Sequence, residues 1–402
     1  MPSSSRPSPL QSNRLPRRLT AAALALVWLA PTIHAELVAP PPGIDAVAAI
    51  LVQAESGAVL YEKDAFKPRP PASMTKIVTA LVVMEKCKLT DIAKVSSRAA
   101  SAIGSKLGLK TGERISVGEL LKGLMLPSGN DTAVCLAEHV SGSEAAFAEV
   151  MNAKADALGA VATHFMNASG LTADDHYSCA RDMAVFALAS RLDPHLRQLI
   201  KQQEAVVRWE SGRTQKVDNR NRLLGQCEGC DGVKTGYTTP AGRCLAASAA
   251  RSGYGLVAVV MKSPDSWTES GKLLNWGFGQ PPVAVVEVSS PASPAGKRFN
   301  APIIDGRLHV PADAFMGALG CSVEQLDQTL VARVGGQHLT FAPGETLYID
   351  GYGPCPDVTS VLWNGRPVAP AANLCRLLGL RLTFDGPTLT ATVGPPASTG
   401  GP

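Results

Sequence analysis

The feature that most constrains the fold is the run Met74–Glu85, whose side chains are apolar on nearly every side. A helix of this kind has no face suited to water, so it must lie inside a large core. The run follows Pro70-Pro71-Ala72-Ser73 and carries Lys76 in its first turn. Residues i and i+3 share a helix face, so the Ser73 hydroxyl and the Lys76 amine are expected to meet. Burial lowers the pKa of a lysine, and a neutral amine can take the proton of a serine nucleophile.

A second polar motif, Ser128-Gly129-Asn130, lies between two segments with helical patterns. Val117–Met125 precedes it and is amphipathic, and Ala133–Val140 follows it. The motif is therefore expected in a loop between helices, where catalytic groups concentrate. Taken alone, the same three residues would be read as an ordinary helix start.

The third motif, Lys-Thr-Gly, occurs twice in the chain. Lys110-Thr111-Gly112 is followed by Glu113-Arg114 and is typical of a polar turn, whereas Lys234-Thr235-Gly236 lies in a run with strand character. A substrate bound along an edge strand needs a cation, a hydroxyl and then a residue without a side chain. We therefore assign Lys234, Thr235 and Gly236 to the site.

The first part of the chain has the pattern of an α+β domain. Ala46–Ala54 and Val59–Glu62 flank a turn and predict a β-hairpin. Three further β-rich runs follow much later, at 232–238, 242–250 and 255–261, and helical patterns occupy much of the middle. The economical arrangement is one antiparallel sheet built from both ends of the domain, with helices packed against it.

Residues 281–301 are rich in Pro, Ser and Ala and predict a linker, and 395–402 predict a disordered tail. Between them, residues 302–394 contain an internal repeat with an offset of 59 residues. The matched pairs are Asp305-Gly306-Arg307 with Asn364-Gly365-Arg366, Pro311-Ala312 with Pro370-Ala371, Leu319-Gly320 with Leu378-Gly379, Thr329-Leu330 with Thr388-Leu389, and Val334-Gly335 with Val393-Gly394.

Each copy of the repeat predicts a hairpin, a short helix and a strand pair. The helices are expected at Ala312–Leu319 and Ala371–Leu378, and each copy is expected to bury the apolar face of the other. This small α+β module resembles the copper amine oxidase N-terminal-like domain. His309 and His338 are its only histidines, so we expect no copper. Binding to the cell wall or to another protein is the expected role.

The first 35 residues have the pattern of a secretory signal peptide. Four arginines precede the apolar run Leu19–Ala30, and Ala35 is the expected cleavage point. The run is shorter than the roughly 20 residues that a membrane anchor needs. Without those four arginines, 34 basic residues balance 34 acidic ones, so no nucleic-acid partner is implied. Export permits disulfides, and Cys227 and Cys230 are the candidate pair.

Residues 44–280 resemble the serine-type D-alanyl-D-alanine carboxypeptidases, which are low-molecular-mass penicillin-binding proteins. The segments that carry the resemblance are Tyr61-Glu62-Lys63, Pro70-Pro71-Ala72-Ser73-Met74-Thr75-Lys76, Ser128-Gly129-Asn130-Asp131, Asn167-Ala168-Ser169-Gly170-Leu171, His176-Tyr177-Ser178 and Asp231-Gly232-Val233-Lys234-Thr235-Gly236-Tyr237-Thr238. The ordered motif set is typical of penicillin-binding proteins and class A β-lactamases, with Ser-Gly-Asn in place of Ser-Asp-Asn. The resemblance implies an α/β (α+β) fold of the β-lactamase/transpeptidase type, with a helical subdomain, over residues 36–280. Where this family often carries a β-rich stalk and an amphipathic membrane anchor, this chain has the repeat module.

The resemblance also implies a role for each site residue. Ser73 is the nucleophile, Lys76 its base, and Ser128 a proton relay to the leaving amine. Asn130 orients the peptide, while Lys234, Thr235 and Gly236 hold the substrate's carboxylate end. The backbone N–H groups of Ser73 and Tyr237 form the oxyanion hole. Peptidoglycan stem peptides are the implied substrates and β-lactams the implied inhibitors, without a metal or cofactor, in an exported protein at the cell wall or membrane periphery.

Three other functions compete with this interpretation. A class A β-lactamase needs a glutamate to activate the deacylating water, and Glu149 with Asn152 has a superficially suitable spacing. An endopeptidase would use the same residues with a different acceptor groove. A wall-binding protein with a vestigial site would not need to keep Ser73, Lys76 and Lys234. The run Asp174-Asp175-His176 has metal-ligand residue types, but consecutive side chains rarely converge on one ion.

Overall fold

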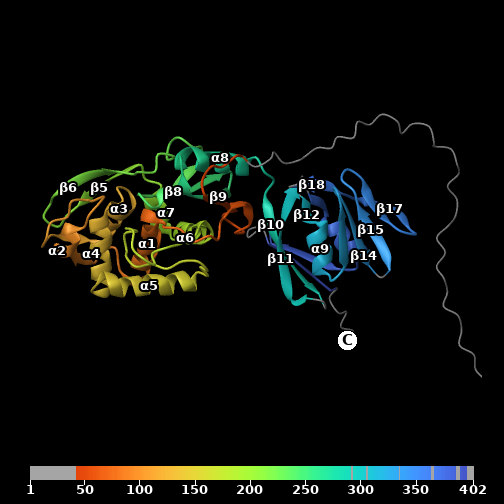
Figure 1. Ribbon diagram of the computed structural model, residues 1–402, viewed down its shortest axis with the longest axis horizontal. Coiled ribbons are helices and arrows are strands. Elements are labelled where there is room, and N and C mark those ends of the chain that lie inside the picture. Colours follow the sequence, from red (N-terminus) through yellow and green to blue (C-terminus); the bar gives the residue numbers. More distant parts are fainter. Residues whose placement is uncertain are drawn as a thin grey trace, which may run out of the picture. The chain divides into compact units, whose positions relative to one another are not determined.

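A computed structural model of the chain describes residues 42–290, 293–304, 307–334, 336–363, 366–385 and 390–395 (Figure 1). The predicted signal peptide (1–35), nearly all of the predicted tail, and the repeat's Asp305-Gly306 and Asn364-Gly365 turns lie outside the described residues. None of the helices in the described ranges is both long enough and apolar enough to cross a membrane.

A five-stranded antiparallel sheet forms the centre of the first domain, with the strand order β2-β1-β9-β8-β7. Its strands are β1 (Ala48–Gln53), β2 (Val59–Lys63), β7 (Cys230–Thr238), β8 (Gly242–Arg251) and β9 (Tyr254–Ser263). The predicted sheet built from both ends of the domain is therefore confirmed. Since β7 is an edge strand, one side of it is open to a ligand.

Helices cover both faces of this sheet. Their bounds are η1 (a 3-10 turn, Ala72–Thr75), α1 (Lys76–Lys86), α2 (Ser97–Ser101), α3 (Val117–Met125), α4 (Asn130–Ser141), α5 (Glu144–Ala157), α6 (Ala180–Leu192), α7 (Pro194–Ile200) and α8 (Ser266–Phe278). Two short hairpins complete the domain: β3 (Ile92–Lys94) with β4 (Arg114–Ser116), and β5 (Glu204–Arg208) with β6 (Thr214–Asp218).

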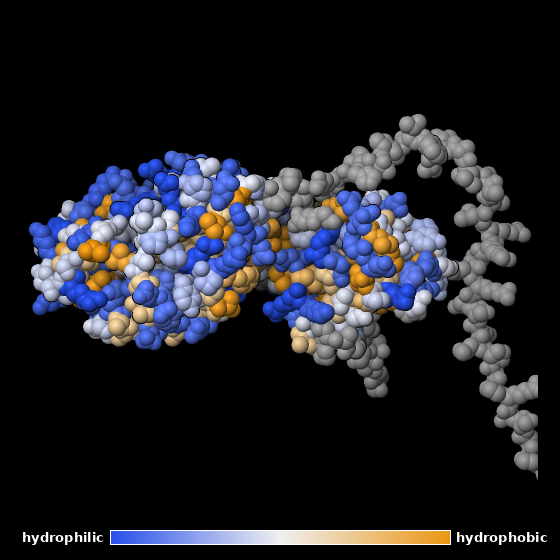
Figure 2. Space-filling view, viewed as in Figure 1, coloured by the Kyte–Doolittle hydropathy of each residue, from blue (hydrophilic) through white to orange (hydrophobic). Residues whose placement is uncertain are grey.

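Alternation along the strands sends side chains to two separate cores. Ile50 and Val259 belong to the core shared with α1, whereas Leu51 and Val260 face the core shared with α8. Helix α1 lies among α3, α4, α5 and α6, as Figure 1 shows, and its residues from Lys76 to Val83 are buried. The prediction from its apolar pattern is confirmed. Hydrophilic residues cover most of the molecular face in Figure 2, with apolar ones in scattered groups.

The predicted linker at 281–301 is wrong. This segment contains β10 (Val283–Ser290) and the start of β11 (Ser293–Ile304), which pair as an antiparallel hairpin. The Pro, Ser and Ala content obscured an alternating pattern in β10, where Val286 and Val288 are fully buried. The seven-stranded sheet that contains strands of the repeat therefore includes β10, which begins about 20 residues before the predicted start of the module at residue 302.

The two repeat copies fold as predicted in their local structure. Copy one contains β12 (Arg307–Pro311), α9 (Ala312–Ala318), β13 (Ser322–Leu326) and β14 (Thr329–Val334); copy two contains β19 (Arg366–Pro370), α10 (Ala371–Leu377), β20 (Arg381–Asp385) and β21 (Thr390–Gly394). Side chains from both copies share one core, including Phe315 and Leu374. Each copy therefore does bury the apolar face of the other.

The strand pairs of the two copies join different sheets. The order β18-β19-β12-β11-β10-β21-β20 places the second copy's pair in the seven-stranded sheet, where β21 runs parallel to β10. The first copy's pair begins the five-stranded sheet β13-β14-β15-β16-β17. The remaining strands are β15 (Gln337–Phe341), β16 (Thr346–Ile349), β17 (Gly353–Thr359) and β18 (Val361–Trp363). The sequence repeat alone did not distinguish these two pairings.

All nine cysteines lie in the described ranges and are free thiols. Among them, Cys227 and Cys230 are not bridged, so the candidate disulfide is not formed in this structure.

Candidate active site

Ser73 and Lys76 meet at the start of α1, as their spacing predicts. Ser73 lies in the 3-10 turn η1, and Lys76 is the first residue of α1. The Lys76 Nζ atom is 2.9 Å from the Ser73 Oγ atom. Ala72, directly before the serine, has a φ of +50°, a conformation that costs energy in a residue with a side chain and is typical of functional sites.

The Lys76 amine is completely buried and has two further partners. Nζ donates to the Asn130 side-chain oxygen at 2.7 Å and to the Ser169 backbone carbonyl at 2.6 Å. Burial holds the pKa of Lys76 well below its usual value, and the charges of Lys234 and Arg220 lower the pKa further. A neutral amine positioned in this way can accept the proton of the Ser73 hydroxyl.

The Ser169 carbonyl is a site group that the sequence analysis did not identify, because every residue carries such an oxygen. Its position comes from Asn167, whose side-chain oxygen accepts from the backbone N–H groups of Ser169 and Gly170 at 3.2 and 2.8 Å. Gly170 has a φ of +81°, and a Cβ there would lie 1.9 Å from the Ala72 carbonyl oxygen. The signature around Asn167 therefore shapes a loop that contacts the turn η1, which carries Ser73.

Asn130 lies beside Lys76, and Ser128 precedes this asparagine by two residues. Asn130 begins α4 instead of lying in a loop as predicted, and its Nδ2 atom donates to the Ile103 carbonyl at 2.6 Å. Ser128 is 3% exposed and has a φ of +68°, and its Oγ atom has no hydrogen-bond partner within the described part of the chain. A buried hydroxyl without a partner can bind a group that a ligand brings.

The Asp131 side chain holds the loop at residues 107–109 in place through hydrogen bonds. Its carboxylate is buried and accepts from the backbone N–H groups of Leu107, Gly108 and Leu109 at 2.9, 2.7 and 3.1 Å. This loop continues from Gly104 and Ser105, which line the cleft at the site. The acid thus positions a wall of the cleft without lying in it.

The Lys234-Thr235-Gly236 motif lies on edge strand β7, next to the serine. Lys234 is 1% exposed, and burial together with the charge of Arg220 lowers its pKa to about 7. Gly236 packs directly on the turn that carries Ser73, since a Cβ there would lie 2.9 Å from the Pro71 carbonyl oxygen and 3.1 Å from the Ala72 Cβ atom. The glycine was predicted to let a substrate approach the strand. In the structure it lets the turn that carries Ser73 approach the strand.

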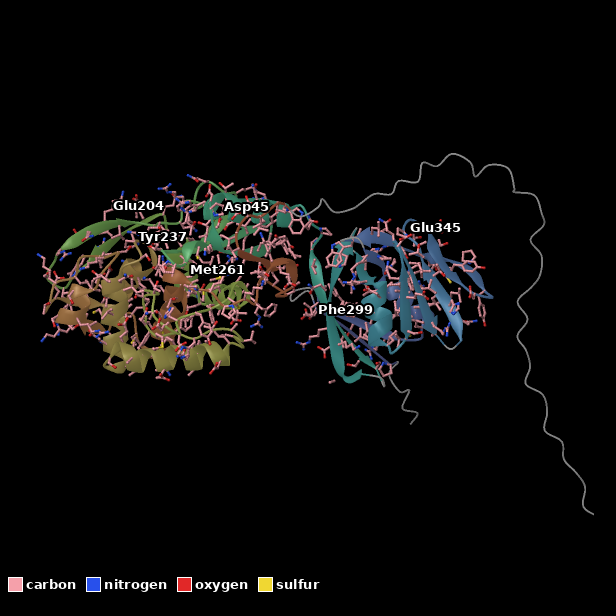
Figure 3. All side chains as sticks on the ribbon, in the orientation of Figure 1. Asp45, Glu204, Tyr237, Met261, Phe299 and Glu345 are labelled. Atoms are coloured by element: carbon pink, nitrogen blue, oxygen red, sulfur yellow. The ribbon has the colours of Figure 1, made fainter. Side chains whose placement is uncertain are left out.

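The site opens into a cleft of about 890 Å³. Ser73, Ser128, Asn130, Thr235, Gly236 and Tyr237 all line it, whereas Lys76 and Lys234 lie buried behind the wall. Tyr237, labelled in Figure 3, is 67% exposed. Arg220 and Trp267 also line the cleft and were not identified from the sequence. The described residues that line it include no aspartate or glutamate, so its charged groups are cationic.

The residues that the sequence analysis set aside lie elsewhere. Lys110 is exposed in a turn, and Glu149 is exposed on α5. Asn152 bonds the backbone of Phe165 with both side-chain atoms, at 2.7 and 3.0 Å. His176 has both ring nitrogens engaged, with Thr75 Oγ1 at 3.0 Å and the Met166 N–H at 3.1 Å. Asn152 and His176 therefore have structural roles here.

Comparison with known proteins gives a consistent result. The family model for D-alanyl-D-alanine carboxypeptidases matches residues 35–265. A D-alanyl-D-alanine carboxypeptidase of Bacillus subtilis, DacF, is 39% identical over 244 residues, which cover 59% of this chain and 63% of the relative. The Escherichia coli relative DacC is 38% identical over 286 residues, covering 67% of this chain and 70% of the relative. The matched region thus spans less than two thirds of the length of the Bacillus relative.

Two solved structures show the same fold. A Streptomyces DD-transpeptidase superimposes with a TM-score of 0.57 at 29% identity, covering 60% of this chain and 99% of that one. A D-alanyl-D-alanine carboxypeptidase of Mycobacterium tuberculosis superimposes with a TM-score of 0.58 at 33% identity, covering 61% and 95%.

Proposed function

This chain belongs to the D-alanyl-D-alanine carboxypeptidase family, and we propose that it removes the terminal D-alanine from peptidoglycan stem peptides through an acyl-enzyme on Ser73. The supporting observation is the fully buried Lys76 amine, 2.9 Å from the Ser73 hydroxyl and bonded to Asn130. Burial favours the neutral amine, which is the form that can act as a base.

In the proposed acylation, Ser73 Oγ attacks the carbonyl carbon between the two terminal D-alanines while its proton moves to Lys76. The negative oxygen of the tetrahedral intermediate binds the backbone N–H groups of Ser73 and Tyr237. The C–N bond then breaks, and Ser128 relays a proton to the leaving amine. The unpartnered Ser128 hydroxyl supports this role, because it is buried beside Asn130 and faces the cleft.

The free carboxylate of the leaving D-alanine is proposed to bind Lys234 and Thr235. Lys234 lies on the strand next to the nucleophile and has a pKa lowered to about 7. A carboxylate arriving beside the amine favours its charged form and so opposes that shift. Arg220, at the same cleft wall, supplies a permanent positive charge.

Deacylation is proposed to use Lys76 again, now activating a water. The cleft's described lining carries no carboxylate, and the candidate deacylating residue of a β-lactamase, Glu149, is exposed on another helix. A site of this kind binds penicillin and releases it slowly. An endopeptidase or a transpeptidase would share the acylation step and differ in the acceptor of the acyl group.

Further proposals concern the ends of the chain. We propose that residues 1–35 are a signal peptide and that the enzyme acts outside the cytoplasm, at the cell wall. We also propose that the C-terminal module is a copper amine oxidase N-terminal-like domain that binds wall or a partner protein. The two-copy fold of that module supports its likeness to a repeat domain.

The test uses two ligands with the purified protein: a fluorescent penicillin and a diacylated Lys-D-Ala-D-Ala peptide. We expect a long-lived penicillin adduct and release of D-alanine, both lost in Ser73→Ala. Serine at position 178, buried and outside the cleft lining, provides a matched control as Ser178→Ala. Rapid penicillin hydrolysis without D-alanine release would instead identify a β-lactamase, and normal labelling of Ser73→Ala would refute the assignment of the nucleophile.

A further inference from the structure

Three residues with metal-ligand side chains converge away from the cleft. The Cys87 sulfur, a carboxylate oxygen of Asp91 and a ring nitrogen of His139 all lie within 4.8 Å of one another. Cys87 directly follows α1, Asp91 closes the turn before β3, and His139 is in the last turn of α4. In the described ranges this is the one group of three such side chains that reaches this spacing.

The convergence follows from the two helices that form the catalytic site. Lys76, the first residue of α1, donates to Asn130, the first residue of α4, at 2.7 Å. The helices contain 11 and 12 residues and pack against each other. The helices are about 17 and 18 Å long at 1.5 Å per residue. Their starts are joined by Lys76 and Asn130, and the Cys87 and His139 ligand atoms lie within 4.8 Å, so the two helices run side by side. Cys87 and His139 are at their far ends.

Hydrogen bonds hold the backbone around this group of residues in place. The Cys87 N–H donates to the Val83 carbonyl at 2.9 Å, which continues the helical hydrogen bonding by one residue. The Asp91 carboxylate accepts from the Lys88 N–H at 2.8 Å, and the Asp91 N–H donates to the Lys88 carbonyl at 3.0 Å. Cys87 and Asp91 are half-buried while His139 is exposed, so an ion can enter from solvent and the imidazole can rotate toward it.

The donor set determines which ion fits. A thiolate, an imidazole and a carboxylate together are typical zinc ligands, whereas calcium and magnesium prefer oxygen donors alone. Tetrahedral zinc with bonds of about 2.0–2.3 Å places neighbouring ligand atoms about 3.5 Å apart. The three donor atoms here lie within 4.8 Å of one another, so side-chain rotations that bring them about 1 Å closer produce the zinc spacing.

We propose that Cys87, Asp91 and His139 bind one Zn²⁺ ion, with water as the fourth ligand, and that the ion ties the far ends of α1 and α4. Binding replaces the thiol proton, which passes to solvent, and involves no change in oxidation state. Burial and the nearby Asp91 carboxylate raise the pKa of the free Cys87 thiol, and a dication at this position reverses the effect of that carboxylate. The ion has no part in the chemistry at Ser73.

Titration of the purified protein, without a histidine tag, with Zn²⁺ tests the proposal. Isothermal calorimetry should give one ion per chain, and Cys87→Ser and His139→Ala should each weaken binding roughly 100-fold or more. The matched controls are Cys321→Ser, also half-buried, and His195→Ala, also exposed, and both should bind zinc like the parent protein. Co²⁺ in place of zinc should produce a thiolate-to-cobalt absorption band in the near ultraviolet that Cys87→Ser lacks.

The unfolding temperature with and without zinc provides a second measurement, which compares each variant with itself. Zinc should raise the unfolding temperature of the parent protein by a few degrees and leave that of Asp91→Asn nearly unchanged. Penicillin labelling of Ser73 reports that each variant is folded, so a failed zinc site and a failed catalytic assignment give different results. Equal zinc affinity in Cys87→Ser, or binding that disappears only in Cys227→Ser, would overturn the proposal.

Discussion

The buried His176 predicts a specific loss of stability in acid. The ring is 5% exposed and packs edge-on against Phe165, with centroids 5.6 Å apart. Its Nδ1 atom accepts from the Met166 N–H, so the neutral ring carries its proton on Nε2 and donates to Thr75 Oγ1. Burial, followed by the charges of His164 and Lys76, lowers the pKa from 6.5 to about 4.

The sign and size of the effect follow from this shift. At neutral pH the ring is uncharged in both the folded and the unfolded chain, so it adds no pH dependence. Between pH 6.5 and about 4 the unfolded chain binds a proton that the folded chain does not, so the free energy of unfolding falls as the pH falls. A difference of about 2.5 pKa units at 1.36 kcal/mol each gives a loss of about 3 kcal/mol.

Urea denaturation of the parent protein and of His176→Gln, followed by circular dichroism between about pH 7.5 and 4, measures this loss. The variant should be less stable by about 1–2 kcal/mol at neutral pH, because contacts are lost. Since the parent alone loses roughly 1.4 kcal/mol per pH unit below about pH 6.5, the two curves should cross between about pH 6 and 5, and the variant should be the more stable protein at about pH 4. As a control, Thr79→Val removes the hydrogen bond from Thr79 to the Ala168 carbonyl, so its curve should run parallel to the parent's. A constant difference between the parent and His176→Gln across this range would refute the reasoning.

Four further predictions concern residues around the cleft and one helix outside it. Gly236→Ala should slow penicillin acylation about 10- to 100-fold in stopped-flow labelling, because the added Cβ meets the turn that carries Ser73; equal rates for this variant and the parent would contradict the packing argument. Gly317→Ala should stabilise α9 by about 0.5–1 kcal/mol in a urea titration, because its added carbon meets no atom of another segment within 4 Å. Asp131→Asn should lower the free energy of unfolding by about 2–4 kcal/mol, since an amide cannot accept from all the N–H groups that the carboxylate binds, and an unchanged urea midpoint would exclude this role. With a Lys234 pKa of about 7, kcat/KM for a peptide with a free carboxylate should fall as the pH rises through about 7. Lys234→Arg should shift this fall in kcat/KM to higher pH, because guanidinium keeps its charge. If the fall stays at the same pH in the variant, it belongs to another group.

Local patterns predicted the elements of the catalytic domain well. The apolar run after Ser73 predicted a buried helix, and α1 is buried. The spacing of Ser73 and Lys76 predicted that their side chains meet, and they form a hydrogen bond. The strand pattern around Lys234 predicted β7, and the choice of this motif over Lys110 is consistent with the positions of both. Such predictions succeed because they depend on interactions between residues close in the sequence.

Composition predicts the wrong structure where a local signal and a long-range pairing partner disagree. Residues 281–301 contain enough proline to suggest a linker, yet β10 pairs with β11 and, in parallel, with β21 about 100 residues later. The zinc ligands are another example, since Cys87 and His139 are 52 positions apart and form no sequence motif. Only the packing of α1 beside α4 places them together.

The sequence by itself determined that this chain carries a serine, a lysine that has to be buried, and a cationic edge strand, because helical and strand periodicities are fixed by backbone geometry. Tertiary structure alone decided the electrostatics of the site. Three features show this: the Ser169 carbonyl binds Lys76, the Arg220 charge lowers the pKa of Lys234, and Gly236 closely approaches the turn that carries Ser73. They bring together residues up to 165 positions apart, Pro71 and Gly236. The pKa values of the two lysines depend on burial and on charges across the cleft, and neither exists until the sheet and the helices have packed.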